Sequence, residues 1–355
     1  MAAEGPEEPV LTGRTGRLAQ LTLNRPRALN ALTRPMVRII DAALARWEHD
    51  EDVAAVVITG AGERGLCAGG DVRAVYEDAR TGGAESPGFW RDEYLLNSRI
   101  ARYPKPYAAI MDGIVMGGGV GVSAHGSVRI VTERSAVAMP ETGIGLVPDV
   151  GGTYLLSRAP GELGTHLALT GRVVRAADAV LCGLADHFVP SELLPELHTA
   201  FAATTTGDLR AAVRPYEQPA PEGDLADGRP WIDACYSADT VEEIVGRLLD
   251  HGDPAAKEAA ATVLTRSPTA LKATLAGLRT ARRLATLEEV LDQEYRASCA
   301  ALATHDLVEG IRAQVIDKDR TPHWSPADLA GVTEADVARF SATPPGGALG
   351  AADRS

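Results

Sequence analysis

The chain has 355 residues, of which 45% are hydrophobic and 23% are charged, and this mixture excludes a disordered, collagen-like or coiled-coil protein. Its 35 Lys and Arg against 48 Asp and Glu give a net charge of −13, which has the wrong sign for a protein that binds nucleic acid phosphates. Four widely spaced cysteines form no C-x-x-C pair, so we expect neither a disulfide framework nor a metal site.

The N-terminal residues and the most glycine-rich stretch carry no signal for export or membrane insertion. The first nine residues, MAAEGPEEP, are acidic and lack the basic and apolar regions of a secretory signal, so we expect a cytoplasmic protein. Residues 113–128 carry no formal charge, but this stretch is shorter than the about 20 apolar residues that span a bilayer. We predict a disordered tail over residues 1–13 and no membrane partner.

Strands and helices alternate through the first half of the chain. Residues 17–24 alternate apolar and polar side chains, which predicts a strand. A helix is expected from Thr33, because apolar residues recur along one face, and residues 53–59 form a β-branched run typical of a buried strand. We expect a loop over residues 61–70, followed by a helix that Asp71 caps.

The alternation continues with a helix over residues 89–103, which ends before Pro104, and a buried strand over residues 107–111. These elements predict a layered α/β core for residues 14–204. Residues 205–230 are rich in Gly, Pro, Asp and Glu, so we expect a linker or a long loop there.

The remaining sequence predicts a helical region over residues 231–340 and a disordered tail over residues 341–355. Leu, Val and Ala recur with helical spacing in four segments, at residues 239–250, 254–267, 268–283 and 287–304.

Two short motifs resemble catalytic signatures without matching them. The segment 60–65 fits G-x-G-x-x-G after a predicted strand, but a Gly/Ser/Pro loop stands where a dinucleotide site needs an acidic residue. Ser123 lies in a near match to G-x-S-x-G whose second glycine is one residue too far, and His125 would face another side of the helix. A dinucleotide enzyme and a Ser hydrolase are therefore disfavoured.

Two glycine clusters each lie before a predicted helix. Residues 67–71 are Cys-Ala-Gly-Gly-Asp, and residues 112–119 are Asp-Gly-Ile-Val-Met-Gly-Gly-Gly. Glycines at a helix N-terminus leave backbone N–H groups open to a ligand, and a pair of such groups can stabilise an oxyanion. Tight turns that use glycine only for its backbone freedom remain the alternative.

Two carboxylates, Glu141 and Asp149, lie in a stretch rich in glycine, proline and apolar residues. Burial raises the pKa of a carboxyl group and prepares it for general-base or nucleophilic chemistry. Capping of a helix by one carboxylate and solvation of the other remain the structural alternative.

Taken together, these motifs resemble the 3-hydroxyisobutyryl-CoA hydrolase family of the enoyl-CoA hydratase/isomerase (crotonase) superfamily, over most of the chain from Leu18 to Leu329. The segments that carry the resemblance lie at residues 24–32, 67–71, 89–94, 116–121, 139–142, 146–152, 240–244, 267–269 and 316–319.

The resemblance implies a spiral of ββα units with a helical C-terminal region, and a site for an acyl-CoA thioester. It assigns the oxyanion-hole amides to Gly70 and Gly118, the catalytic carboxylate to Glu141 and its partner to Asp149. Glu93 would contact the acyl end of the substrate. No cofactor is implied, because coenzyme A is part of the substrate, and a homo-oligomer stays open.

One departure from the superfamily pattern separates two reactions. Hydratases of the superfamily normally place a second glutamate where this chain has Gly121. Hydration needs that second proton-transfer group, whereas thioester hydrolysis needs an oxyanion hole and one base or nucleophile. The resemblance therefore implies hydrolysis of 3-hydroxyisobutyryl-CoA in valine degradation, with Glu141 either attacking the carbonyl or deprotonating water.

Three alternatives remain open at this point: an enoyl-CoA hydratase or isomerase, a hydrolase of 3-hydroxypropionyl-CoA, and a non-catalytic acyl-CoA-binding or scaffold protein. The CoA phosphates need local positive charge in an acidic protein. From Pro9 to Ile40 the chain has arginines and no acidic residue, and we expect Arg25 and Arg27 to contact these phosphates.

Overall fold

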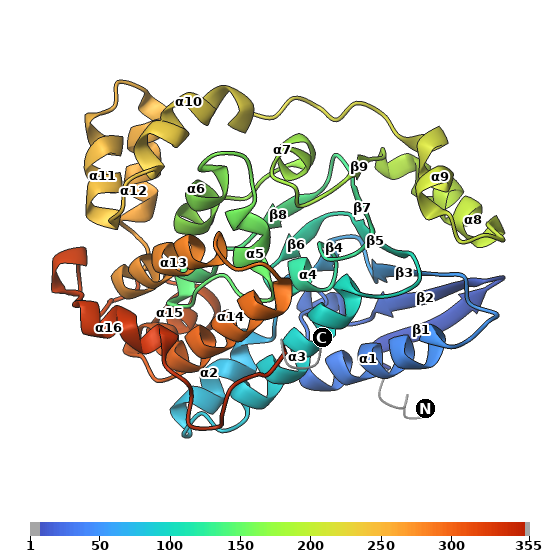
Figure 1. Cartoon of the computed structure of the whole chain (residues 1–355), viewed down its shortest axis with the longest axis horizontal. Coiled ribbons are helices and arrows are strands. Elements are labelled where there is room, and N and C mark those ends of the chain that lie inside the picture. Colours follow the sequence, from blue (N-terminus) through green and yellow to red (C-terminus); the bar gives the residue numbers. More distant parts are fainter. Residues whose placement is uncertain (1–7, 352–355) are drawn as a thin grey trace.

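The computed structural model describes residues 8–351 and contains two β-sheets, with helices packed around them (Figure 1). The strands are β1 Val10–Thr15, β2 Leu18–Leu23, β3 Ala55–Gly60, β4 Gly65–Cys67, β5 Tyr107–Met111, β6 Ile114–Met116, β7 Val128–Val131, β8 Ala136–Ala138 and β9 His187–Phe188. The helices of the first half are α1 Arg34–Glu48, α2 Val72–Arg80, α3 Ser86–Ala101, α4 Gly118–Gly121, α5 Gly152–Ser157, α6 Leu163–Thr170, α7 Ala176–Leu181, α8 Leu194–Ala203 and α9 Leu209–Val213.

The C-terminal region is helical, and Figure 1 shows it on one side of the sheets. Its helices are α10 Leu225–Tyr236, α11 Val241–Asp250, α12 Pro254–Val263, α13 Pro268–Ala281, α14 Leu287–Leu302, α15 His305–Ile311 and α16 Glu334–Ala338. The shorter helical segments of the chain are η1 Pro26–Ala28, η2 Glu141–Ile144, η3 Ser191–Leu193, η4 Arg214–Tyr216, the π-helix η5 Arg312–Ile316, η6 Leu329–Gly331 and η7 Arg339–Ser341.

The strands form a spiral of repeated units. The six-stranded sheet has the order β1-β2-β3-β5-β7-β9, and the three-stranded sheet has the order β4-β6-β8. In each of the pairs β3–β4, β5–β6 and β7–β8, the first strand joins the large sheet, the second joins the small sheet, and a helical segment follows. Among the strands named above, β1 and β2 pair antiparallel and every other pair is parallel. This arrangement confirms the predicted spiral of ββα units with a helical C-terminal region.

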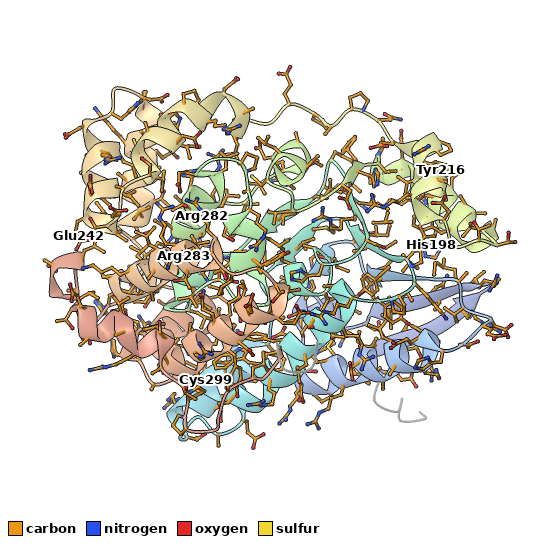
Figure 2. All side chains as sticks on the ribbon, viewed as in Figure 1. His198, Tyr216, Glu242, Arg282, Arg283 and Cys299 are labelled. Carbon is orange, nitrogen blue, oxygen red and sulfur yellow. The ribbon has the colours of Figure 1, made fainter. Side chains whose placement is uncertain are left out.

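Apolar side chains cover both faces of the large sheet. One face packs against α8 and α9 through buried residues that include Leu197, Phe201 and Leu209. The other face belongs to the main core, which contains the predicted apolar stripe of α1. Figure 2 places His198 and Tyr216 at the α8 and α9 edge of the molecule and Glu242 at the opposite edge.

The structure differs from the sequence prediction in several strands, among them β1 and β4. Residues 10–13, predicted to be tail, belong to β1, where only Val10 is buried, so the strand lacks the alternation that marks a half-buried strand. The predicted loop 61–70 contains the three-residue strand β4, which is too short to produce a periodic signal. Residues 1–7 lie outside the described part of the chain.

Two C-terminal predictions also need correction. Residues 205–230 contain α9, η4 and the start of α10, and the buried Leu209 and Val213 anchor α9 on the sheet. In the predicted tail, Leu349 and Ala351 are 2% and 3% exposed, and Arg91 donates hydrogen bonds to the carbonyls of Ala348 and Leu349. Residues 352–355 lie outside the described part.

Within residues 8–351, every helix is too short or too polar to cross a bilayer. In the same part of the chain, no group of three or more His, Cys, Asp and Glu side chains has an arrangement that could hold a metal ion.

Candidate active site

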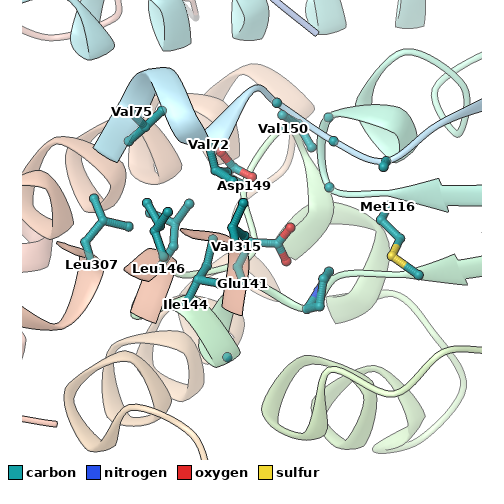
Figure 3. Close-up of a pocket in the computed structure, with 18 of the residues that line it drawn as sticks. Val72, Val75, Met116, Glu141, Ile144, Leu146, Asp149, Val150, Leu307 and Val315 are labelled. Carbon is teal, nitrogen blue, oxygen red and sulfur yellow. The ribbon is translucent and has the colours of Figure 1, made fainter. Parts of the chain in front are cut away.

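A cavity of about 280 Å³ lies where the two glycine clusters, α3, η2 and the C-terminal segments α15 and η5 meet. Figure 3 shows the carboxylates of Glu141 and Asp149 in this cavity among apolar side chains. Leu307 and Val315 of the C-terminal region belong to that apolar wall. The cavity is therefore largely apolar, with a few charged groups, as is usual for a small-molecule site.

The glycine clusters bring two backbone amides together. A Cβ atom built on Gly118 would lie 3.2 Å from the Gly70 nitrogen, and one built on Gly69 would lie 3.8 Å from the Gly118 nitrogen. Within residues 8–351, neither Gly70 nor Gly118 donates its N–H to a backbone carbonyl. Two neighbouring free donors of this kind can bind an oxyanion.

Glycine is required sterically at this point of the chain. Gly117 has a φ of +49°, and a Cβ there would lie 2.9 Å from Glu141 Oε1. A Cβ on Gly118 would lie 2.5 Å from Glu93 Oε1. The glycines thus leave room for the two carboxylates as well as exposing the amides.

Glu141 begins the η2 turn directly after Pro140 and is 5% exposed. Its Oε2 atom is buried and has no hydrogen-bond partner among the described residues. Burial, together with the nearby charge of Asp149, raises the pKa of Glu141 well above its usual value. An unpartnered buried carboxylate is a strong candidate for a group that acts on a substrate.

Asp149 is 5% exposed and accepts a hydrogen bond of 2.6 Å from the Tyr94 hydroxyl. The same hydroxyl lies 2.7 Å from Ser298 Oγ. Because Tyr94 gives its one proton to Asp149, Ser298 is the donor in the second bond. Burial raises the pKa of Asp149 to about 6, although the Tyr94 hydrogen bond opposes this shift.

Glu93 adds a third carboxylate to the cavity from α3. It is 2% exposed, and its Oε1 atom has no hydrogen-bond partner within residues 8–351. Burial and the charge of Asp149 raise its pKa well above the usual value. Burial and mutual repulsion of three carboxyl groups in one apolar cavity therefore disfavour their simultaneous ionisation.

The position of Gly121 has no space for a side chain. A Cβ built there would lie 2.7 Å from the Val150 Cβ and 2.9 Å from Asn97 Nδ2. A glutamate at this position would require both neighbours to move. The packing around this position is therefore fitted to glycine, and the position offers no carboxyl group.

Comparison with known proteins identifies the family. The family model described as enoyl-CoA hydratase/isomerase matches residues 18–341. The 3-hydroxyisobutyryl-CoA hydrolase of Rattus norvegicus is 45% identical over 92% of this chain and 87% of its own length. The human protein of the same name is 43% identical over 93% of this chain and 87% of its own length. The chain belongs to the 3-hydroxyisobutyryl-CoA hydrolase family. This membership confirms the resemblance seen in the sequence motifs.

Solved structures show that the whole architecture is shared with other members of the superfamily. A structure described as a carnitinyl-CoA dehydratase from Mycobacterium thermoresistibile is 55% identical, with a TM-score of 0.92 over 96% of this chain and 98% of its own. An enoyl-CoA hydratase from Rhodobacter sphaeroides is 44% identical, with a TM-score of 0.90 over 96% and 99%.

The prediction of a cytoplasmic protein is contradicted by the curated relatives. The names of the rat, zebrafish and human hydrolases, at 43–45% identity, all include the word mitochondrial. The acidic N-terminal composition does not outweigh the names of these relatives, so the prediction of a cytoplasmic location is wrong.

The structure gives Arg25 a structural contact. Its guanidinium donates to the carbonyl of Ala31 and forms an ion pair of 3.0 Å with Asp71. Asp71 stands at the N-cap position of α2, as predicted, but its side chain pairs with Arg25 and makes no capping hydrogen bond. Arg27 is exposed. A role of either arginine in binding CoA phosphates stays a prediction.

The residues of the two disfavoured motifs have structural contacts. Ser123 is fully buried and donates to the carbonyl of Gly119 at 2.6 Å. His125 Nε2 lies 2.8 Å from the Val150 carbonyl oxygen. Burial raises the pKa of Cys67, beside the first glycine cluster, to about 12, which keeps its thiol protonated.

Sequence reasoning missed the residues that reach the site from distant parts of the chain. Tyr94 and Ser298 hold Asp149, and Arg266 and Gln314 line the cavity. The Arg266 guanidinium donates to the Thr170 carbonyl and lies in the wall of the cavity. Tyr94 belongs to the motif at residues 89–94, but nothing in the sequence indicated that it contacts Asp149.

Proposed function

We propose that this chain hydrolyses the thioester of 3-hydroxyisobutyryl-CoA to 3-hydroxyisobutyrate and CoA. The observation that carries the proposal is the buried Glu141, with its unpartnered Oε2 atom, beside two neighbouring amides. Gly121, which packs against Val150 and Asn97, supplies no further carboxyl group there. The family membership supports the choice of substrate, since the curated relatives carry this activity in their names.

In this proposal the thioester oxygen accepts the N–H groups of Gly70 and Gly118, which stabilise the negative charge of the tetrahedral intermediate. Glu141 acts at the carbonyl carbon. Asp149, held by Tyr94, orients water or the 3-hydroxyl of the substrate, and Glu93 contacts the acyl end.

Two routes use the same groups. In the first, the Glu141 carboxylate attacks the carbonyl, CoA leaves as thiolate and takes up a proton, and water hydrolyses the resulting anhydride. In the second, Glu141 removes a proton from water, the hydroxide attacks the carbonyl carbon, and CoA leaves as thiolate and takes up that proton. Hydroxylamine added during turnover competes with water for the anhydride, and a hydroxamate formed on the Glu141 side chain marks the anhydride route.

A dehydratase or hydratase is the second candidate, because a 55% identical structure is described as a dehydratase. Hydration moves protons at two carbons, and the site offers Asp149 and Glu93 as further carboxyl groups. The absence of a group at Gly121 argues against this candidate.

Substrate turnover distinguishes the candidates. Purified protein is given 3-hydroxyisobutyryl-CoA, 3-hydroxypropionyl-CoA and crotonyl-CoA, and free thiol and the enoyl chromophore are followed together. We expect thiol release from the first substrate to be fastest and the crotonyl chromophore to persist. Loss of the chromophore without thiol release would overturn the proposal in favour of a hydratase, and binding without any turnover would indicate a non-catalytic protein.

A further inference from the structure

The turn that follows Asp149 has an unusual backbone. Val150 has a φ of +53°, a left-handed conformation that a β-branched residue rarely adopts, and Gly151 follows with a φ of +81°. The Gly152 N–H donates to the Asp149 carbonyl at 2.6 Å, which closes the turn. Strained conformations of this kind persist only where surrounding contacts impose them, and they cluster at functional sites.

The contacts that impose this turn come mainly from Glu294 on α14. Its Oε2 atom accepts the Gly151 N–H at 2.6 Å, and its Oε1 atom accepts the N–H and the hydroxyl of Thr153 at 2.8 and 2.5 Å. Glu294 is 1% exposed, so water does not compete for these bonds. On the other side of the turn, His125 contacts the Val150 carbonyl.

The same helix also reaches the carboxylate end of Asp149. Ser298 lies four residues after Glu294, which places both side chains on one face of α14. Ser298 bonds the Tyr94 hydroxyl, which donates to Asp149. Helix α14 therefore fixes the backbone that follows Asp149 through Glu294 and its side chain through Ser298 and Tyr94.

We propose that Glu294 is a positioning residue of the active site, whose carboxylate holds the left-handed turn at Val150 and thereby aims Asp149 into the cavity. This inference rests on the proposed thioester hydrolysis for its kinetic consequence. Its structural consequence, the conformation of the turn, is independent of the reaction.

The direct variant is Glu294→Gln, which keeps the size of the side chain. An amide has one acceptor oxygen, and its NH₂ group must face an N–H donor of Gly151 or Thr153. We expect kcat for thiol release to fall about 10²-fold, because small misplacements of catalytic groups reduce kcat by this order. We expect KM to stay within twofold of the wild-type value. In a crystal structure of this variant we expect Val150 to leave the left-handed region and the Tyr94–Asp149 hydrogen bond to lengthen.

Glu288→Gln is the matched control on the same helix. Glu288 is 3% exposed, and its carboxylate bonds Ser98 and Arg102 instead of the backbone of the turn. We expect this control to lower stability and leave kcat within twofold of the wild-type value. An equal fall of kcat in both variants would show a merely structural role and overturn the proposal.

Thr153→Val is the milder variant, and it decides the question if Glu294→Gln does not fold. It removes one of the three donors to Glu294 and keeps the shape of the side chain. We expect a several-fold fall in kcat at constant KM, and an unchanged kcat would contradict the proposal. If wild-type protein releases no thiol, the proposed function fails, but the crystal structures still test the inference. An unaltered turn in Glu294→Gln would overturn it. Where Thr153→Val replaces that variant, an unaltered turn in Thr153→Val would overturn it.

Discussion

At the residue scale, the site depends on carboxyl groups that are buried against their electrostatic preference. Glu93, Glu141 and Asp149 share one apolar cavity, and each has a raised pKa because burial disfavours the charged form. Such an arrangement reduces folding stability, and groups with raised pKa values of this kind are typical of functional sites. Substitutions of Asp149 and Gly118 test the effects of the buried carboxyl groups and of the neighbouring amides.

Asp149→Asn is expected to lower activity and raise stability. The folded state favours protonated Asp149, with a pKa of about 6 against the usual 3.8, so its contribution to stability is present at low pH and is lost as pH rises from about 4 to about 6. At pH 8 the substitution removes this cost, and we expect the melting temperature to rise by about 2–5 °C. At pH 4 the gain is smaller. Asp239→Asn, at an exposed residue, serves as control and is expected to change neither the activity nor the melting temperature. A lower melting temperature for Asp149→Asn at pH 8 would contradict this prediction.

Gly118→Ala is expected to block the oxyanion site. The added methyl group would lie 2.5 Å from Glu93 Oε1 and 3.2 Å from the Gly70 nitrogen, in the space that the thioester oxygen needs. We expect kcat for thiol release to fall about 10²–10³-fold, the usual effect of losing an oxyanion-hole donor. Gly246→Ala, where a Cβ meets nothing within 4 Å, should keep full activity and gain about 1 kcal/mol of helix stability. Equal activity of the two variants would exclude the oxyanion role.

The candidate residues that the sequence predicts all lie in short local motifs. Gly70, Gly118 and Glu141 stand in short segments with unusual glycine content or an out-of-place charge. The contact between Tyr94 and Ser298 joins residues 204 positions apart, and the contact between Glu294 and Gly151 spans 143. Sequence patterns report local periodicity, so they did not predict partners that only the folded chain brings together.

At the element scale, the elements with strong apolar periodicity were predicted well. Helix α1 begins directly after Thr33, and β5 has the predicted bounds Tyr107–Met111. The misses include β1, which is exposed along most of its length, and the short strands β4, β6, β7, β8 and β9. These strands form through pairing with neighbours, a contribution that a pattern within one segment does not contain.

The segment that closes the cavity from the C-terminal side depends on Arg312. Its guanidinium bonds three carboxylates, those of Glu309, Asp317 and Asp319, and η5 carries the cavity-lining Val315. The backbone carbonyl of Val315 also accepts a hydrogen bond from Arg73 on α2. These contacts join the C-terminal region to the helix that follows the first glycine cluster.

Arg312→Lys is expected to loosen this wall. An ammonium group does not bind three carboxylates in the planar geometry of a guanidinium. We expect KM for the CoA ester to rise about fivefold, which corresponds to about 1 kcal/mol, with a smaller change in kcat. Arg247→Lys, in a surface pair with Glu243 on α11, serves as the control. An unchanged KM in steady-state kinetics would show that the segment does not contribute to substrate binding.

At the scale of the whole molecule, the helical C-terminal region completes the site that the spiral begins. Helix α14 packs on α3, and α15 packs on α2 and η2, so segments far apart in the sequence meet at the cavity. The last described residues extend this packing, because Leu349 is buried and the Ala351 N–H donates to Asp292 on α14. Low sequence complexity predicted disorder there, but it did not reveal that an apolar residue has a place to pack.

Leu349→Ala measures how far the C-terminal segment stabilises the fold. Removing a buried leucine side chain costs about 2–4 kcal/mol, through lost burial and the cavity left behind. Leu249→Ala on α11, where the leucine is 49% exposed, should change the free energy of unfolding by less than about 0.5 kcal/mol. Urea denaturation of both variants gives the comparison. Equal effects would mean that residues 342–351 are not part of the folded unit.

The central claim is that Glu141 performs thioester hydrolysis beside the Gly70 and Gly118 amides. The most direct measurement is free-thiol release from 3-hydroxyisobutyryl-CoA by wild-type protein and Glu141→Gln, with binding of the ester measured for both. We predict rapid release by the wild type, a loss of about 10³-fold or more in the variant, and binding within a few-fold of the wild type. Release by Glu141→Gln at a near wild-type rate would contradict the claim.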